Sequence, residues 1–272
     1  MLKYIGKEII MIDTHCHLSM VLDENGRVDY NEIDNILKQM VVDGVTHAIT
    51  VGSNIEDSKL SIEIAKHYDN IYCAVGVHPE EVESFDIEEL ENLLKLNLDS
   101  GNLVAIGEIG LDYYWRKDNK EAQIEIFKKQ IELAKKYNLP IIVHCRDAYG
   151  DVLEVLKEYA PFDKGGVIHC YSGSIEWAKE VIKLGFLISF TGVVTYPNAI
   201  NIQEVAKWVD NDKFMVETDS PFLTPVPFRG KKNNPSYTKY TLEYIARLKN
   251  KISEEIDIIT TNNAIKLFDL NG

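Results

Sequence analysis

The sequence predicts a closed (β/α)₈ barrel, because short apolar strands and amphipathic helices alternate eight times along the chain. The strands are almost wholly apolar, which is typical of a parallel sheet covered on both faces. Eight such units favour a closed barrel over an open doubly wound sheet. No linker, composition break or low-complexity segment interrupts the 272 residues. We therefore expect a single domain over residues 1–272.

The predicted strands are short runs of aliphatic and β-branched residues bounded by polar residues or glycine. The first lies in the segment Met11–Leu18, and the others are expected at 48–51, 71–75, 103–106, 140–143, 166–168, 186–190 and 214–216. Residues 1–8 precede the first strand, so we expect them to form a peripheral, partly disordered leader.

The predicted helices have apolar residues at helical spacing. The first begins at Asp29 and ends at Gly44, and the second is capped by residues 52–54 and continues to about Tyr68. The others are expected at 87–98, 121–137, 152–159, 175–184, 202–208 and 237–248, with an extra C-terminal helix at 253–268. Each predicted strand is thus followed by a helix, as the barrel requires.

The composition limits the function classes. The chain has 29 Lys and Arg against 43 Asp and Glu, a net charge of −14, which argues against a protein that coats nucleic acid with a broad basic face. Bound cations could still supply local positive charge for a phosphodiester substrate. The four cysteines form no C-x-x-C pair and are expected to be reduced. No segment resembles a membrane span or a signal peptide, so we expect a cytoplasmic protein.

Polar side chains collect at the carboxyl ends of the predicted strands, where a barrel of this type has its active site. Single histidines at strand ends are more often structural. A group of imidazoles and carboxylates packed together would, however, repel or stay neutral without cations between them. The whole set therefore predicts a metal centre, and its members are His15, His17, Glu108, His144, His169 and Asp219.

Six candidate ligands exceed the number that one ion normally takes, so we expect two divalent ions. One ion would be held by His15, His17 and Asp219, the other by His144 and His169, with Glu108 bridging both. Imidazole ligands favour Zn²⁺ or Mn²⁺, and Mg²⁺ is possible. Paired ions can activate a hydroxide at neutral pH. Structural readings stay open for Glu108, as a partner of Arg146, and for Asp219, as a turn cap before Pro221.

No serine or cysteine has the setting of a nucleophile. Cys16, Cys145 and Cys170 each directly follow a predicted ligand, so on a strand they would point the opposite way. Hydrolysis without a covalent intermediate is the resulting expectation.

Six motifs resemble, in order and spacing, the TatD-family metal-dependent deoxyribonucleases, a branch of the amidohydrolase-like barrels. They are DTHCH at 13–17, GVHP at 76–79, GEIGLDY at 107–113, VHCRDA at 143–148, HCYSG at 169–173 and ETDSPFL at 217–223. The resemblance implies the two-ion ligand set above, a further role of Asp219 in proton transfer, and phosphodiester hydrolysis of DNA. The leader before Met11 departs from the family pattern.

Four further residues are candidate substrate contacts, namely Arg146, Arg229, His78 and Tyr113. Arg146 would share the face of His144 if its strand continues, and could hold a phosphate oxygen, although an ion pair with Asp147 or Glu108 is equally consistent. Arg229 lies in a loop with two lysines that could supply a cationic patch, or could simply be solvated. For His78 we favour a supporting or phosphate-binding role over metal ligation.

The aromatic residues after Glu108 are the last candidates. Tyr113 is our candidate for stacking on a base or sugar, together with Tyr114 and Trp115; packing of the rim is the alternative. Asp112 is expected to orient a ligand histidine or its own loop.

These observations favour a hydrolase that cleaves phosphodiester bonds of DNA with a hydroxide activated by two ions. Single-stranded DNA or frayed ends are the expected substrate, with no membrane and no obligatory protein partner. One alternative is an amidohydrolase-like enzyme that acts on a small lactone, amide or aminoacyl ester. Another is a metal-stabilised binding scaffold without catalytic activity.

Overall fold

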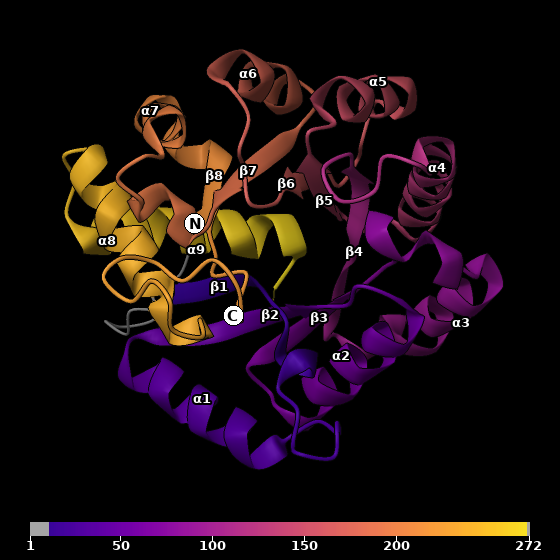
Figure 1. Cartoon of the computed structure of the whole chain (residues 1–272), viewed down its shortest axis with the longest axis horizontal. Coiled ribbons are helices and arrows are strands. Elements are labelled where there is room, and N and C mark those ends of the chain that lie inside the picture. Colours follow the sequence, from indigo (N-terminus) through magenta and orange to yellow (C-terminus); the bar gives the residue numbers. More distant parts are fainter. Residues whose placement is uncertain (1–10, 271–272) are drawn as a thin grey trace.

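The computed structural model describes residues 11–270, and eight parallel strands in this range are hydrogen-bonded in sequence order. Figure 1 looks along the barrel, with the strands in the middle and the helices around them. The strands are β1 (Met11–Cys16), β2 (Val45–Val51), β3 (Ile71–Val75), β4 (Leu103–Asp112), β5 (Ile141–Arg146), β6 (Gly166–Ile168), β7 (Phe186–Phe190) and β8 (Phe214–Val216). The predicted (β/α)₈ barrel is confirmed.

The first and last strands close the barrel near their carboxyl ends. The backbone N–H of Asp219 donates to the carbonyl oxygen of His15 at 2.8 Å, and the N–H of His17 donates to the carbonyl of Ser220, also at 2.8 Å. Thr14 adds a side-chain hydrogen bond from Oγ1 to the carbonyl of Val216 at 3.1 Å. Segments some 200 residues apart in the sequence are thereby joined next to the predicted ligands.

A helix follows each strand and lies on the outside of the barrel (Figure 1). The helices are α1 (Tyr30–Val42), α2 (Ile55–His67), α3 (Ile87–Asn97), α4 (Lys120–Tyr137), α5 (Tyr149–Tyr159), α6 (Ile175–Lys183), α7 (Ile200–Trp208), α8 (Thr238–Leu248) and the extra α9 (Ser253–Phe268). Short 3₁₀ turns cover Leu18–Met20, Pro79–Ser84, Leu98–Ser100, Gly192–Thr195, Asn211–Lys213 and Pro235–Tyr237. Side-chain caps of the expected kind start several helices, such as Asp29 before α1 and Asn54 before α2.

Strand β4 is longer than expected, because it continues past residue 106 to Asp112. After a break in register following Ile106, the segment pairs with β5, with Gly110 opposite His144 and Asp112 opposite Arg146. A Cβ atom on Gly110, whose φ is +145°, would lie 2.0 Å from the carbonyl oxygen of His144. Only glycine therefore permits this close approach of β4 to β5.

Helix α9 covers the amino-terminal end of the barrel. Its Ala264, Leu267 and Phe268 are buried in one apolar cluster with barrel residues such as Ile12 and Tyr72. The amino-terminal end is thus filled with apolar side chains, and the polar side chains gather at the opposite end. No helix within residues 11–270 is long and apolar enough to cross a membrane. The leader predicted at residues 1–8 lies outside the described residues.

Candidate metal centre

His15 and His17, at the carboxyl end of β1, project to the same side, as strand alternation predicts. Their Nε2 atoms are 3.3 Å apart, and both side chains are buried. The Nδ1 atom of His17 lies 2.9 Å from the carbonyl oxygen of Val51. Since a carbonyl oxygen only accepts, Nδ1 donates the hydrogen, and Nε2 can present its lone pair to a cation.

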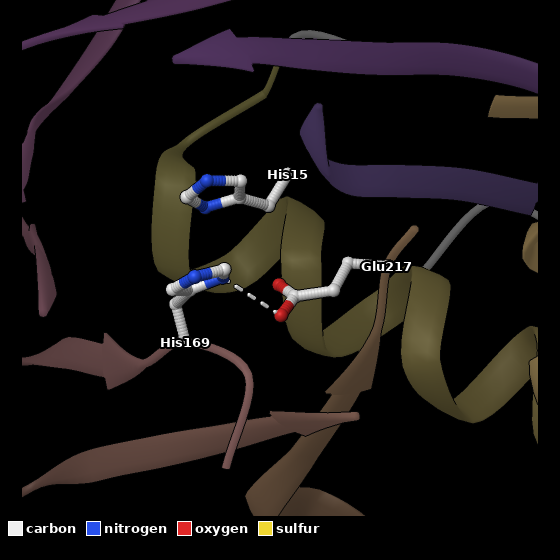
Figure 2. Close-up of side chains that lie close together, drawn as sticks. All are labelled: His15, His169 and Glu217. Carbon is white, nitrogen blue, oxygen red and sulfur yellow. Dashed lines mark hydrogen bonds and ion pairs between the residues drawn. The ribbon is translucent and has the colours of Figure 1, made fainter. Parts of the chain in front are cut away.

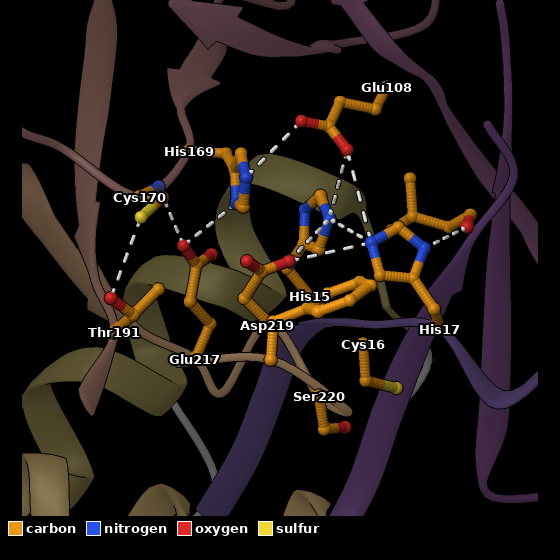
Figure 3. A network of polar contacts seen from close by, with 12 residues as sticks. His15, Cys16, His17, Glu108, His169, Cys170, Thr191, Glu217, Asp219 and Ser220 are labelled. Atoms are coloured by element: carbon orange, nitrogen blue, oxygen red, sulfur yellow. Dashed lines mark hydrogen bonds and ion pairs between the residues drawn. The ribbon is translucent and has the colours of Figure 1, made fainter. Parts of the chain in front are cut away.

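Glu108 of β4 stands between two groups of histidines, with one carboxylate oxygen toward each. Its Oε2 is 3.4 Å from Nε2 of His15 and 4.0 Å from Nε2 of His17. Its Oε1 is 2.7 Å from Nδ1 of His144 and 3.2 Å from Nε2 of His169. Figure 3 shows the carboxylate between His169 and the β1 pair. This arrangement allows Glu108 to bridge two cations.

The first group of ligand atoms is completed by Asp219, which follows β8. Its Oδ1 lies 3.7 Å from Nε2 of His15 and 3.4 Å from Nε2 of His17. Ligand atoms about 2.0–2.1 Å from a tetrahedral ion are separated by about 3.4 Å. The Nε2 atoms of His15 and His17 are 3.3 Å apart, and each lies 3.4 to 4.0 Å from an oxygen of Glu108 and from an oxygen of Asp219. Each of these carboxylates could therefore share one divalent ion with the two histidines.

The second group surrounds the other oxygen of Glu108. The ring of His144 is held between Glu108 and Asp112, whose Oδ2 is 2.9 Å from Nε2, so Nδ1 faces Glu108. Together with Nε2 of His169, this nitrogen could ligate a second ion. His78 lies at the edge of the same group, with Nε2 3.7 Å from Oε1 of Glu108. The structure therefore brings all six predicted ligands together.

Glu217 is a functional candidate to which the sequence analysis gave no role. Its Oε1 accepts hydrogen bonds from Nδ1 of His169 at 3.0 Å and from the backbone N–H of Cys170 at 2.7 Å. Figure 2 shows it beside His169 and His15, whose rings stack with centroids 3.7 Å apart. Its position two residues before Asp219 was the available signal, because that spacing places both carboxylates on one face of an extended segment.

The carboxylates of the centre are ionised because histidines surround them. Burial opposes ionisation of Glu108, but the charges of His169 and His78 and two hydrogen bonds outweigh it and hold the pKa well below the usual value. Burial lowers the pKa of His144, yet its bonds to Asp112 and Glu108 raise that pKa to about 9. A divalent cation would displace protons from such histidines, so its affinity should increase with pH.

A pocket of about 760 Å³ opens at this end of the barrel. Within residues 11–270, Arg146 is the one arginine or lysine among its lining residues, and His78 also lines it. Strand β5 does continue to Arg146. In this range the guanidinium forms no ion pair with Asp147 or Glu108; it lies 4.4 Å from the ring centre of Tyr114. Arg146 is thus free to bind an anion in the pocket.

Two of the predicted substrate contacts, Tyr113 and Arg229, do not line the pocket. Tyr113 is buried in the apolar layer outside the barrel, its hydroxyl donates to Oδ2 of Asp151 at 2.6 Å, and it is absent from the pocket lining. Its location agrees with the packing alternative, and Trp115 is the residue of this aromatic run that lines the pocket. Arg229 is exposed outside the lining, with its guanidinium 4.1 Å from the ring centre of Tyr196.

Cys145 and Cys170, which we expected to point away, are among the residues that line the pocket. Cys145 is only 8% exposed and packs in the same apolar cluster as Tyr113, so the exception to the expectation is Cys170. The reason for Cys170 is that β6 ends at Ile168, so Cys170 belongs to a turn, with φ of +44°, and strand alternation no longer applies. Burial raises the pKa of the Cys170 thiol to about 12. The thiol stays protonated at neutral pH and is a poor nucleophile.

Comparison with known proteins agrees with this geometry. The family model described as "TatD related DNase" matches residues 12–269. The uncharacterized metal-dependent hydrolase YabD of Bacillus subtilis is 43% identical over 262 residues, which are 96% of this chain and 100% of that protein. The uncharacterized metal-dependent hydrolase YcfH of Escherichia coli is 37% identical, with 97% of each chain covered.

A solved structure is also similar to this chain. The crystal structure of YjjV, a TatD homologue from Escherichia coli, superposes with a TM-score of 0.88 at 28% identity and covers 96% of this chain and 98% of its own. The family model and the curated relatives each cover nearly the whole described chain. The chain therefore belongs to the TatD-related DNase family.

Proposed function

We propose that the protein is a metal-dependent hydrolase that cleaves phosphodiester bonds of DNA, single-stranded or at frayed ends. The position of Glu108 carries this proposal, since its two oxygens face the separate groups His15/His17 and His144/His169. Family membership and the names of the relatives support it. A cytoplasmic location and a single-domain organisation remain predictions that accompany it.

The proposed centre holds two divalent ions. His15, His17, Glu108 and Asp219 would hold one of them, and His144, His169 and Glu108 would hold the other. Histidine-rich ligation favours Zn²⁺ or Mn²⁺ over Mg²⁺. When bound, such ions neutralise phosphate oxygens and lower the pKa of water.

The residues of the chain position the substrate and move the proton. Burial raises the pKa of Asp219, but the hydrogen bond from His17 and the charges of nearby histidines hold it below the usual value. Asp219 is thus ionised and can accept the proton of the attacking water. Arg146 binds a phosphate oxygen from the wall of the pocket, with His78 beside the second ion. Arg229, which lies outside the pocket lining, contacts the DNA strand farther from the bond that is cleaved.

The test uses purified protein with all added metal removed and then Mn²⁺, Zn²⁺ or Mg²⁺ supplied singly. A labelled single-stranded oligonucleotide, its duplex, and a panel of lactones, amides and aminoacyl esters are offered in parallel. We expect cleavage of the single strand with at least one metal and none with chelator. Turnover of a carbonyl substrate without DNA cleavage would overturn the proposal in favour of an amidohydrolase-like enzyme, and no turnover at all would favour a binding scaffold.

A further inference from the structure

Trp115 presents an exposed aromatic surface at the pocket. It lies in the loop between β4 and α4, lines the pocket, and is 60% exposed. The other two tryptophans are more covered, Trp177 at 9% and Trp208 at 38%, and neither lines the pocket. A large apolar ring exposed beside a polar centre offers a surface for a flat ligand group.

The loop that carries Trp115 is fixed to the candidate metal centre. Oδ1 of Asp112 accepts the backbone N–H groups of Tyr114 at 2.9 Å and Trp115 at 2.8 Å. The other oxygen of the same carboxylate lies 2.9 Å from Nε2 of His144. One side chain therefore ties the backbone of Trp115 to the second group of ligands, and the guanidinium of Arg146 lies 5.9 Å from the indole ring centre.

A second exposed aromatic side chain lines the same pocket. Phe222 is 50% exposed, and its backbone N–H donates to the carbonyl oxygen of Asp219 at 2.9 Å. Its ring meets the ring of His17 edge-on, with centroids 6.2 Å apart. Because β4 and β8 are separated by three strands in either direction around the barrel, Trp115 and Phe222 belong to opposite walls, with the ligand groups between them.

We propose that Trp115 and Phe222 stack on the nucleobases that flank the phosphate held at the centre. The inference rests on the proposed function and adds the feature of the substrate that is recognised: an unpaired base on each side of the bond. Stacking accepts any base, because every base has a π-face. Bases inside a duplex are already stacked on their neighbours and offer no free face, so a duplex must fray before it can occupy both walls.

The first experiment compares two strands of equal length, an oligothymidylate and a sugar-phosphate oligomer without bases, with the metal-loaded enzyme. Trp115→Ala and Phe222→Ala should each lower kcat/KM for the oligothymidylate between about fivefold and a hundredfold, and change the value for the abasic strand by less than twofold. Trp208→Ala, an exposed tryptophan on α7 outside the pocket lining, is the control and should change neither. An equal effect on both strands, or none, would overturn the inference.

A binding measurement separates this inference from the proposed function. An oligothymidylate with slowly hydrolysed phosphorothioate linkages should quench tryptophan fluorescence of the metal-loaded protein, and Trp115→Phe should remove the quenching while Trp208→Phe retains it. Quenching that depends on Trp115 in a protein that cleaves no DNA would reject the proposed function alone. Quenching that survives Trp115→Phe, or no quenching in the unchanged protein, would reject the stacking role.

Discussion

Glu217 holds the ring of His169 in one orientation, because its Oε1 lies 3.0 Å from Nδ1 and also accepts the N–H of Cys170 at 2.7 Å. Burial favours the neutral form of Glu217, but the charge and hydrogen bond of His169 keep its pKa below the usual value. The carboxylate thereby directs Nε2 of His169 toward Glu108. Removal of a partner of this kind commonly lowers metal affinity or activity about 10- to 100-fold.

The first prediction follows from this pair. Glu217→Gln should weaken binding of the second ion about 10- to 100-fold, since a neutral amide polarises the imidazole less than a carboxylate. Titration against a fluorescent chelator measures the affinity. Glu204→Gln, at an exposed residue paired with Lys207, serves as the control and should match the unchanged protein. Equal affinities in all three proteins would show that Glu217 has no such role.

The bridging position of Glu108 predicts a change in metal content. Glu108→Ala should reduce bound metal from two equivalents per chain to one or none, because both groups of ligands lose an oxygen. Elemental analysis after dialysis gives the count. Glu81→Ala removes another carboxylate of the pocket lining and should retain two equivalents. Two equivalents in the Glu108 variant would contradict the bridge.

Asp219 is expected to contribute to turnover beyond ligation. Asp219→Asn keeps the size of the side chain but cannot take up a proton, so kcat at saturating metal should fall about 10²- to 10⁴-fold. Steady-state cleavage of a labelled single strand measures it. Asp147 also lines the pocket, and in the Asp147→Asn variant kcat should fall less than tenfold. Comparable losses in both variants would mean that general pocket charge, and not proton transfer, explains the effect.

A buried acid on α9 predicts a pH dependence of stability away from the metal centre. Asp257 is 3% exposed and accepts a hydrogen bond from Thr261, and burial raises its pKa from 3.8 to about 6. The folded state thus binds this proton more tightly than the unfolded state. The contribution of this proton to the free energy of unfolding is complete below about pH 4 and is lost as the pH rises to about 6.

Asp257→Asn stays neutral and should be more stable than the unchanged protein above pH 6, by at most about 3 kcal/mol. The difference should vanish near pH 4. Urea unfolding from pH 4 to 8 measures it, and Asp163→Asn at an exposed position controls for the loss of one negative charge. A difference independent of pH would refute the assignment.

The barrel was predictable because apolar strand composition and helical periodicity are local properties. The convergence of the six predicted ligands was predictable as well, since each lies near the carboxyl end of a strand and these ends meet at one rim. Strand β4 was predicted too short because Glu108 reads as the end of an apolar run; pairing of Ile109–Asp112 with β5 extends it. That pairing is a contact between distant segments, which periodicity cannot show.

The substrate contacts were harder to predict for the same reason. Whether Tyr113 or Trp115 reaches the pocket depends on where β4 ends and on how Asp112 turns the next residues. The position of Arg229 depends on the path of a long loop that carries few regular elements. Side-chain direction in loops has no fixed period, so the sequence indicated the aromatic run 113–115 but could not show that Trp115 is its member in the pocket lining.

The backbone bond from Asp219 to His15 has a consequence for biosynthesis. These two predicted ligands are about 200 residues apart in the sequence, so a nascent chain contains His15 long before Asp219 is made. A nascent chain lacks the complete first group of ligands until its last strand docks beside its first. Binding of the first ion by its full set of ligands would therefore require a closed barrel.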